Sequence, residues 1–338
     1  MDTKNLSLVT GANGHLGNNL VRALLNKGLP VRASVRNASN KEPFQGLNCE
    51  VVQADIMDKG SLVRALKNVD TFYAVGAVYK LWAKNQEKEI YDVNIQGTIN
   101  SVEAAVEAGV RRIVYVSSIA ALNFLKEQPI KESYGFNPDR RNWYYNSKND
   151  AEILALELAA KNNIELVSVL PSAMIGSDAF KTINVSYNII ALILNGEIPV
   201  ETNISLNWVD GKDVAEGCYL AATKGRNLER YILASECGMS LKETIKIAQE
   251  IFPELKLKLP TPLPKFLLYS IAALMELGGK LTGKAPLLSI NDIAMFSGLK
   301  QNFDISKARN ELGYNPKPPK QAVIEAMQYL MTNKQRLL

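Results

Sequence analysis

Residues 6–17 read Leu-Ser-Leu-Val-Thr-Gly-Ala-Asn-Gly-His-Leu-Gly and decide the fold. The first five of these residues are typical of a buried strand. After the glycines, Leu16, Leu20 and Leu24 repeat at the spacing of one apolar helix face. Gly28 ends this helix, and a second strand-like run follows. The sequence therefore predicts a strand, a glycine turn, a helix and a strand at the start of the chain.

The three glycines of this turn have separate physical roles. Gly11, Gly14 and Gly17 follow the spacing G-x-x-G-x-x-G, which differs from the more usual G-x-G-x-x-G. One glycine permits the sharp turn, one lets the backbone approach a pyrophosphate, and one lets the helix pack on the strand. The free N–H groups at the helix start favour a phosphate. We therefore predict a dinucleotide site formed by Thr10, Gly11, Asn13, Gly14, His15, Leu16 and Gly17.

Strand-like and helix-like segments alternate through the first half of the chain. The predicted strands after the first are residues 31–35, 50–54, 71–75, 112–116 and 164–170, and the predicted helices between them are 61–67, 90–108 and 144–162. This alternation of strands and helices predicts a doubly wound parallel α/β sheet of the Rossmann type. We expect residues 1–172 to form the dinucleotide domain, with 206–235 returning to it. Residues 173–205 and 236–338 are expected to form a smaller lobe over the carboxyl ends of the strands.

Three side chains could perform chemistry at that edge. Tyr144 and Lys148 are four residues apart at the start of a predicted helix, so both lie on one face, and Ser118 follows a predicted strand. A nearby ammonium lowers a tyrosine pKa and makes the phenol a usable acid or base. Tyr145 is the alternative tyrosine, but its spacing to Lys148 is three residues. The alternative interpretation of the pair is an exposed Tyr and Lys on a surface helix.

The combination of motifs resembles the extended short-chain dehydrogenase/reductases, within the NAD-dependent epimerase/dehydratase superfamily. The motifs that carry the resemblance are 10–17, Asp55-Ile56, 116–118, Tyr144-x-x-x-Lys148, 304–308 and 312–316. Residues 31–37 are similar to dihydroflavonol 4-reductases and cinnamoyl-CoA reductases, and 283–286 are similar to 3β-hydroxysteroid dehydrogenase-like members. His15 departs from the aromatic residue usual at its position.

The resemblance implies roles for individual residues. Tyr144 is expected to protonate the carbonyl oxygen, Lys148 to hold the nicotinamide ribose and lower the tyrosine pKa, and Ser118 to orient the carbonyl. The remaining implied positions are Asp55 and Ile56 beside the adenine, Pro171 and Ser172 beside the nicotinamide, and Asn94 in support of the active site.

The segment after the second strand indicates which cofactor is preferred. Enzymes that use NAD place an acid there to bind the ribose 2′-hydroxyl. This chain offers no acid there and has Arg36, which could pair with a 2′-phosphate with help from Arg32 or Lys41. We predict NADP(H), with NAD(H) as the alternative if Arg36 only stacks on the adenine.

Composition narrows the class of protein further. The 338 residues are 47% hydrophobic and 22% charged with a net charge of +5, and no block of basic residues indicates nucleic acid. His15 is the single histidine, so a metal site or a Ser-His-Asp triad is not expected. Three isolated cysteines and a polar start without a signal peptide favour the cytoplasm. Residues 266–277 are apolar but too short to span a bilayer, which leaves a buried or partner-facing helix or contact with a membrane surface.

The substrate is less clearly indicated. Aromatic and methionine candidates for the pocket, each of which could instead belong to the core, are Tyr79, Trp82, Phe124, Trp143, Met174, Phe180, Tyr187 and Trp208. Residues 182–209 contain no Lys or Arg to hold a sugar-nucleotide pyrophosphate, which favours an uncharged apolar carbonyl compound. The sequence thus predicts an NADP(H)-dependent carbonyl reductase. The alternatives are a sugar-nucleotide epimerase with bound NAD and a non-catalytic NADP-binding protein. The family resemblance also implies a possible homodimer through helices 90–108 and 144–162.

Overall fold

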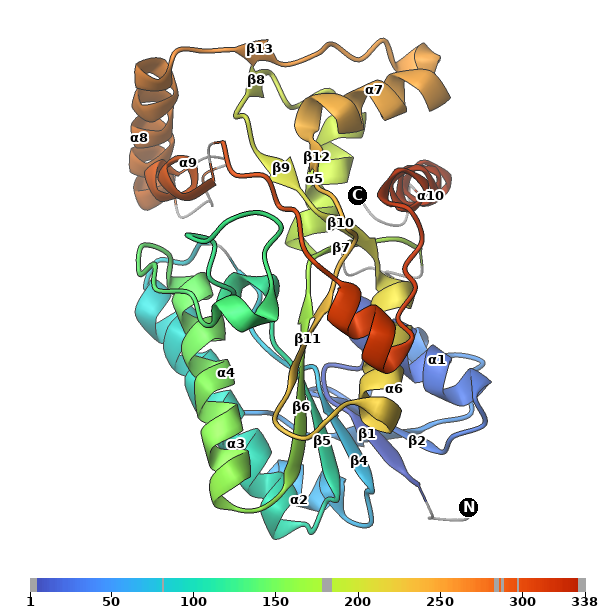
Figure 1. The fold of residues 1–338 in the computed structure, drawn as a ribbon. Helices are drawn as coiled ribbons and strands as arrows, with labels where there is room; N and C mark the ends of the chain where they lie inside the picture. The colour runs from blue at the N-terminus through green and yellow to red at the C-terminus, as the bar shows by residue number, and fades with distance from the viewer. Residues whose placement is uncertain are drawn as a thin grey trace.

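The structure is a computed structural model, and it describes residues 5–80, 82–177, 184–282, 286, 289–296 and 298–333. A twisted central sheet forms one end of the molecule, and a second group of helices and short strands lies across the carboxyl end of that sheet (Figure 1).

Seven parallel strands make up the central sheet, in the order β11-β6-β5-β4-β1-β2-β3. They are β1 (Ser7–Val9), β2 (Val31–Val35), β3 (Glu50–Gln53), β4 (Thr71–Ala74), β5 (Arg112–Val116), β6 (Glu165–Pro171) and β11 (Arg230–Leu233). In the register, Val9 is opposite both Ala33 and Tyr73, so neighbouring strands end at the same edge. The predicted doubly wound parallel sheet is confirmed.

Helices cover both faces of the sheet (Figure 1). One face is covered by α1 (His15–Asn26) and α6 (Gly211–Lys224), and the other by α2 (Lys59–Leu66), α3 (Asp92–Glu107) and α4 (Trp143–Lys161). The helix α4 begins one residue before the predicted start, because the side chain of Asn142 accepts hydrogen bonds from the backbone N–H groups of Tyr144 and Tyr145. A π-turn, η2 (Glu87–Tyr91), leads into α3.

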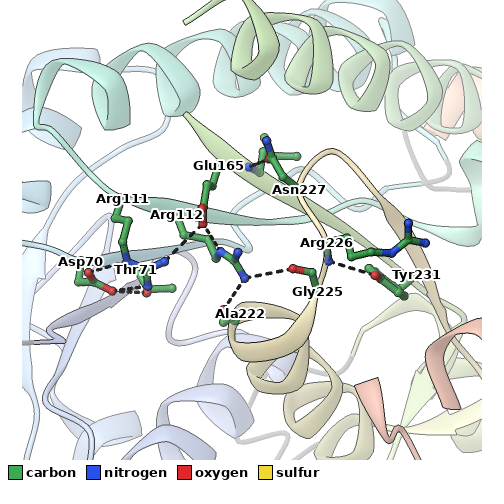
Figure 2. Close-up of polar contacts among 11 residues, drawn as sticks. Asp70, Thr71, Arg111, Arg112, Glu165, Ala222, Gly225, Arg226, Asn227 and Tyr231 are labelled. Atoms are coloured by element: carbon green, nitrogen blue, oxygen red, sulfur yellow. Dashed lines mark hydrogen bonds and ion pairs between the residues drawn. The ribbon is translucent and has the colours of Figure 1, made fainter. Parts of the chain in front are cut away.

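A polar network closes the amino end of the sheet, away from the carboxyl edge. Figure 2 shows Arg112 between the Glu165 carboxylate, 2.6 Å from its Nε, and the carbonyl oxygens of Ala222 and Gly225 at the end of α6. Beside it, Arg111 forms a two-pronged contact with Asp70 at 2.8 and 2.9 Å. These contacts tie β5 and β6 to the adjacent helix at the opposite edge from the candidate site.

The second lobe has an apolar core of its own, which includes Tyr187, Trp208 and Met327. Its elements are β7 (Ala173–Ile175), α5 (Val185–Leu194), β8 (Val200–Glu201), β9 (Ser205–Leu206), β10 (Trp208–Asp210), β12 (Met239–Ser240), α7 (Leu241–Ile251), β13 (Thr261–Pro262) and α10 (Pro319–Thr332). The short strands pair two by two and were not predicted, because two or three residues carry too little periodicity. The apolar run over residues 180–194 predicts a helix, and the structure shows α5 after the Asn184 cap; residues 180–183 lie outside the described residues.

Two further helices, α8 (Lys265–Thr282) and α9 (Ile290–Phe296), lie at the outer edge of the second lobe (Figure 1). The proline-rich segment before α8 supplies β13, which pairs with β8. Single-turn helices complete the chain: η1 (Glu42–Phe44), η3 (Ile119–Ala121), η4 (Glu132–Tyr134), η5 (Pro253–Leu255) and η6 (Ala308–Leu312). Within the described ranges, no helix combines the length and apolar character needed to cross a bilayer.

Candidate functional site

A cavity of about 1400 Å³ lies at the carboxyl edge of the sheet, between the sheet and the second lobe. All fifteen site residues proposed from the sequence line it: Thr10, Gly11, Asn13, Gly14, His15, Leu16, Gly17, Arg36, Asp55, Ile56, Ser118, Tyr144, Lys148, Pro171 and Ser172. Folding thus brings together residues that are up to 162 positions apart in the chain. The individual roles of these residues stay predictions.

The glycine turn forms one end of the cavity. Gly11 has φ +60°, and a side chain on Gly17 would put its Cβ 2.2 Å from the Gly11 carbonyl oxygen. The N–H of Gly14 donates to that same oxygen at 2.9 Å. Because the N-cap of α1 is Gly14, no cap side chain covers the N–H groups of the first helical turn. The turn therefore has the shape and the polarity that a dinucleotide pyrophosphate requires.

His15 joins the turn to the second lobe. The side chain is buried, its Nδ1 is 2.9 Å from Asn184 Nδ2, and its ring stacks on Tyr187 with centroids 5.7 Å apart. The His15 ring therefore packs against the second lobe. These contacts explain how the turn accommodates a histidine at this position.

The expected adenine side of the cavity is formed by the ends of β2 and β3. Asn100 donates from Nδ2 to the Ile56 carbonyl at 2.8 Å, and a Cβ on Gly97 would lie 2.7 Å from the Ile56 side chain, so Ile56 is held firmly. Asp55 accepts a hydrogen bond from the Met57 N–H at 2.9 Å. This end of the cavity therefore has a fixed apolar wall beside a carboxylate, and the role of both residues at an adenine stays a prediction.

The basic residues near this end separate into two groups. Arg36 is exposed and lines the cavity together with Asn37 and Asn40. The suggested help from Arg32 is wrong, because its guanidinium contacts Glu50 at 2.7 Å and the carbonyl oxygens of residues 65 and 67. Lys41 is exposed and is not among the cavity-lining residues. Only Arg36 of the three is therefore in position to meet a ribose phosphate.

Tyr144, Ser118 and Lys148 all line the cavity. Lys148 Nζ donates to the Val116 carbonyl at 2.9 Å. Burial lowers the pKa of Lys148 to about 8, and the negative charge of Glu152 opposes this shift.

The pKa of Tyr144 does not follow the sequence-based expectation. We expected Lys148 to lower it, but burial raises it well above its usual value, and the neighbouring Tyr79 adds to that rise. A hydrogen bond with the Ser118 hydroxyl acts in the opposite direction. The expectation was wrong for this structure because the Lys148 ammonium is directed to a backbone carbonyl and desolvation dominates.

Asn94 lies behind the catalytic candidates. It is buried, donates from Nδ2 to Ser147 Oγ at 2.9 Å, and accepts from the Val78 N–H at 2.8 Å. These bonds connect α3, the segment after β4, and the helix that carries Tyr144. Asn94 therefore supports the site from behind, as the family resemblance implied.

At the expected nicotinamide side, Pro171 and Ser172 end β6. Ser172 Oγ donates to Asn207 Oδ1 at 2.9 Å, and Asn207 Nδ2 donates to the Ser235 carbonyl at 2.7 Å. Asn207 is fully buried and was not found from the sequence. Nothing in the sequence around it, where polar and apolar residues alternate from Asn203 to Trp208, sets Asn207 apart.

Only some of the residues predicted to line the substrate pocket lie at the cavity. Tyr79 and Met174 line the cavity, whereas Tyr187 and Trp208 are buried in the lobe core. Four candidates remain, and none is in the described cavity lining: Phe124, which packs on Phe303; Trp143, which packs on Tyr91; Trp82; and Phe180, which lies outside the described residues.

The sequence missed the apolar end of the cavity. Its side chains come from four segments: Ile189 and Leu192, Ile198 and Val200, Ile204 and Leu206, and Leu268, Ile271 and Met275. The described residues contain no group of three or more His, Cys, Asp or Glu side chains arranged to hold a metal ion.

The arrangement of a glycine turn, a Tyr-x-x-x-Lys helix and a parallel sheet defines a class of protein. Residues 7–234 match the NAD dependent epimerase/dehydratase family, and the chain belongs to that family. This membership confirms the predicted resemblance and the predicted nicotinamide dinucleotide cofactor.

Individual relatives agree with the assignment. The chain is 34% identical to a putative dihydroflavonol 4-reductase of Synechocystis, over 96% of this chain and 94% of that protein. It is 29% identical to sterol demethylase protein B of Methylococcus capsulatus, over 95% of this chain and 97% of the relative. A cinnamoyl-CoA reductase of rice is 29% identical over 74% of this chain and 77% of its own length. The relatives named as reductases agree with the predicted oxidoreductase chemistry.

Solved structures show the same fold. The crystal structure of gox2253 matches with a TM-score of 0.82 and 32% identity, over 99% of this chain and 100% of that one. Gre2 of Candida albicans, solved with NADPH, matches with a TM-score of 0.76 and 22% identity over 97% and 99% of the two chains. Both structures therefore share the fold of this chain over nearly its whole length.

Proposed function

We propose that this protein is an NADP(H)-dependent carbonyl reductase. The observation that carries the proposal is that Ser118, Tyr144 and Lys148 line the same cavity as the glycine turn. When bound, the cofactor supplies a hydride to a carbonyl carbon. The Tyr144 phenol gives its proton to the carbonyl oxygen, and the Ser118 hydroxyl, which already hydrogen-bonds Tyr144, orients that oxygen. The high pKa of the buried tyrosine suits a group that must remain protonated until the hydride arrives.

The preference for NADP(H) rests on Arg36. This side chain is exposed at the cavity edge, and the segment after β2 provides no carboxylate to bind a ribose 2′-hydroxyl. A guanidinium recognises a phosphate by paired hydrogen bonds. Tighter binding of NADH than of NADPH in a fluorescence titration would refute this part of the proposal.

The substrate we propose is an uncharged, largely apolar aldehyde or ketone, flavanone-like or steroid-like in size. Among the described cavity-lining residues that come from the second lobe, Glu197 is the only charged one. Relatives named for dihydroflavonol and for cinnamoyl-CoA reduction support a carbonyl substrate. A screen of NADPH oxidation over aldehydes, ketones, dihydroflavonols and steroids tests this directly.

Tyr144→Phe is the sharpest test of the mechanism. It removes the donated proton but keeps the ring, so turnover is expected to fall by about 10²–10⁴-fold while NADPH affinity stays nearly unchanged. Tyr145→Phe is the matched control, because Tyr145 also lines the cavity. Unchanged turnover of the Tyr144 variant, or an equal loss in the control, would contradict the assignment.

The family description favours one alternative, a sugar-nucleotide epimerase that retains NAD. Cofactor that survives purification together with conversion of UDP-sugars would establish it. No turnover over the whole panel despite NADPH binding would instead indicate a non-catalytic NADP-binding protein. We also propose a cytoplasmic homodimer through α3 and α4, which sedimentation of the purified chain tests.

A further inference from the structure

Exposed apolar side chains are concentrated on one helix of the second lobe. Among the described residues, large apolar side chains are exposed at fourteen positions, and nine of these lie between Leu259 and Ile290. On α8, Phe266, Leu274 and Leu281 are 68%, 70% and 80% exposed. Single exposed apolar residues are common, but a group of this kind marks a surface that contacts something else.

The exposed residues of α8 form a continuous stripe. Phe266, Leu274, Leu277 and Leu281 are separated by eight, three and four positions, so they lie on one helix face. The opposite face is already used, since Leu268 and Ala272 are buried and Ile271 and Met275 line the cavity. A helix that is apolar on both faces has more apolar surface than packing within this lobe buries. Among the described residues, nothing therefore covers the outer stripe.

The charge around the stripe indicates what kind of surface it contacts. Lys256, Lys258 and Lys265 are exposed just before and at the start of α8. Residues 255–275 contain no Asp or Glu, and the first acid, Glu276, accepts a hydrogen bond from the Ile290 N–H at 2.8 Å. Of the three lysines, only Lys265 is on α8, since Lys256 and Lys258 come before β13. An apolar stripe that begins at a lysine and has no acid before Glu276 complements acyl chains beneath anionic headgroups. A second copy of the chain on this face would instead bring the same positive charges together.

We propose that α8 lies flat on an anionic lipid surface, with its outer stripe inserted at the boundary between headgroups and acyl chains. At about 1.5 Å per residue the eighteen-residue helix is about 27 Å long, so its whole stripe can lie in the plane of the interface. The inner face of the same helix borders the apolar end of the cavity, which places that end within about one helix diameter, ~10 Å, of the lipid. The proposal concerns binding and does not depend on the proposed reaction.

Vesicle flotation of the full chain tests the proposal. The protein is expected to float with vesicles of phosphatidylcholine and phosphatidylglycerol, and less with phosphatidylcholine alone. Phe266→Gln, Leu274→Gln and Leu281→Gln combined should weaken binding by about tenfold or more, because each change removes apolar insertion while keeping good helix propensity. None of the three residues is in the described cavity lining. Leu125→Gln is the matched control, because Leu125 is 71% exposed outside this region, and it should change binding less than about twofold.

A second variant keeps the test decisive if the first one folds poorly. Lys265→Gln should weaken the preference for phosphatidylglycerol and leave the circular dichroism spectrum unchanged. Absence of flotation with either vesicle, or equal flotation of the parent and the Phe266/Leu274/Leu281 variant, would overturn the proposal. Concentration-dependent dimerisation that the same variant abolishes, without vesicle binding, would also overturn it and show that a second copy covers the stripe.

Discussion

Glu152→Gln should reveal the largest buried electrostatic contribution in the sheet domain. Glu152 lies on α4, one helical turn after Lys148, and is fully buried. Its carboxylate accepts hydrogen bonds from Ser117 Oγ at 2.7 Å, Ser168 Oγ at 2.6 Å, and Arg230 Nε and Nη2 at 2.8 and 3.0 Å. These four bonds join α4 to the residue after β5, to the middle of β6 and to the first residue of β11.

Glu152→Gln should lower the free energy of unfolding because it leaves a buried charge without its partner. The glutamine keeps the shape but removes the charge, and it leaves the guanidinium of Arg230, only 8% exposed, without its counter-ion. Removing one partner of a buried pair costs about 3–5 kcal/mol. The exposed Arg111–Asp70 pair at the amino end of the sheet is worth about 0–1 kcal/mol, although its geometry is as good.

Urea unfolding followed by circular dichroism measures the difference. We expect Glu152→Gln to lower the free energy of unfolding by about 3 kcal/mol or more and Arg111→Gln to lower it by less than about 1 kcal/mol. Glu152→Gln combined with Arg230→Met should be more stable than Glu152→Gln alone, because the unpaired charge is gone. If Glu152→Gln and Arg111→Gln cost the same, burial does not strengthen this pair and the reasoning is refuted.

Two further predictions concern the active site. Lys148 has a pKa of about 8, below the 10.5 of a free lysine, so kcat/KM should fall as the pH rises through about 8 and the ammonium is lost. Between pH 8 and 10.5 the unfolded chain binds the proton and the folded chain does not, so this group makes the free energy of unfolding rise with pH there. Lys148→Met should remove that part of the slope in urea titrations, and an unchanged slope would contradict the assigned pKa. Gly17→Ala places a Cβ 2.2 Å from a backbone oxygen, so it should cost about 1–3 kcal/mol and abolish NADPH binding in a fluorescence titration. Gly278→Ala, where a Cβ meets nothing within 4 Å, is the control and should leave NADPH affinity intact.

Local patterns in the sequence determined the sheet domain and the candidate site. The glycine spacing at Gly11, Gly14 and Gly17 required a particular turn, and the four-residue spacing of Tyr144 and Lys148 required a shared helix face. Parallel strands end at one edge, so residues that follow different strands could be expected to meet. Each of these arguments uses the geometry of one element or of one repeating connection, which is why the sequence was sufficient.

Which side chains reach the cavity, which are buried and which pair with distant residues was decided only by the tertiary structure. The sequence offered Arg36 as the phosphate partner with possible help from Arg32, but Arg32 lies near the start of β2 and Arg36 follows its end, so only Arg36 of the two reaches the cavity. The tyrosine pKa depended on burial rather than on the nearby lysine. The buried Glu152–Arg230 pair joins residues 78 positions apart. The apolar stripe of α8 was visible in the sequence, but which of its two apolar faces is covered depended on how the rest of the lobe packs. Burial is a property of the whole packed chain, and no local spacing reports it.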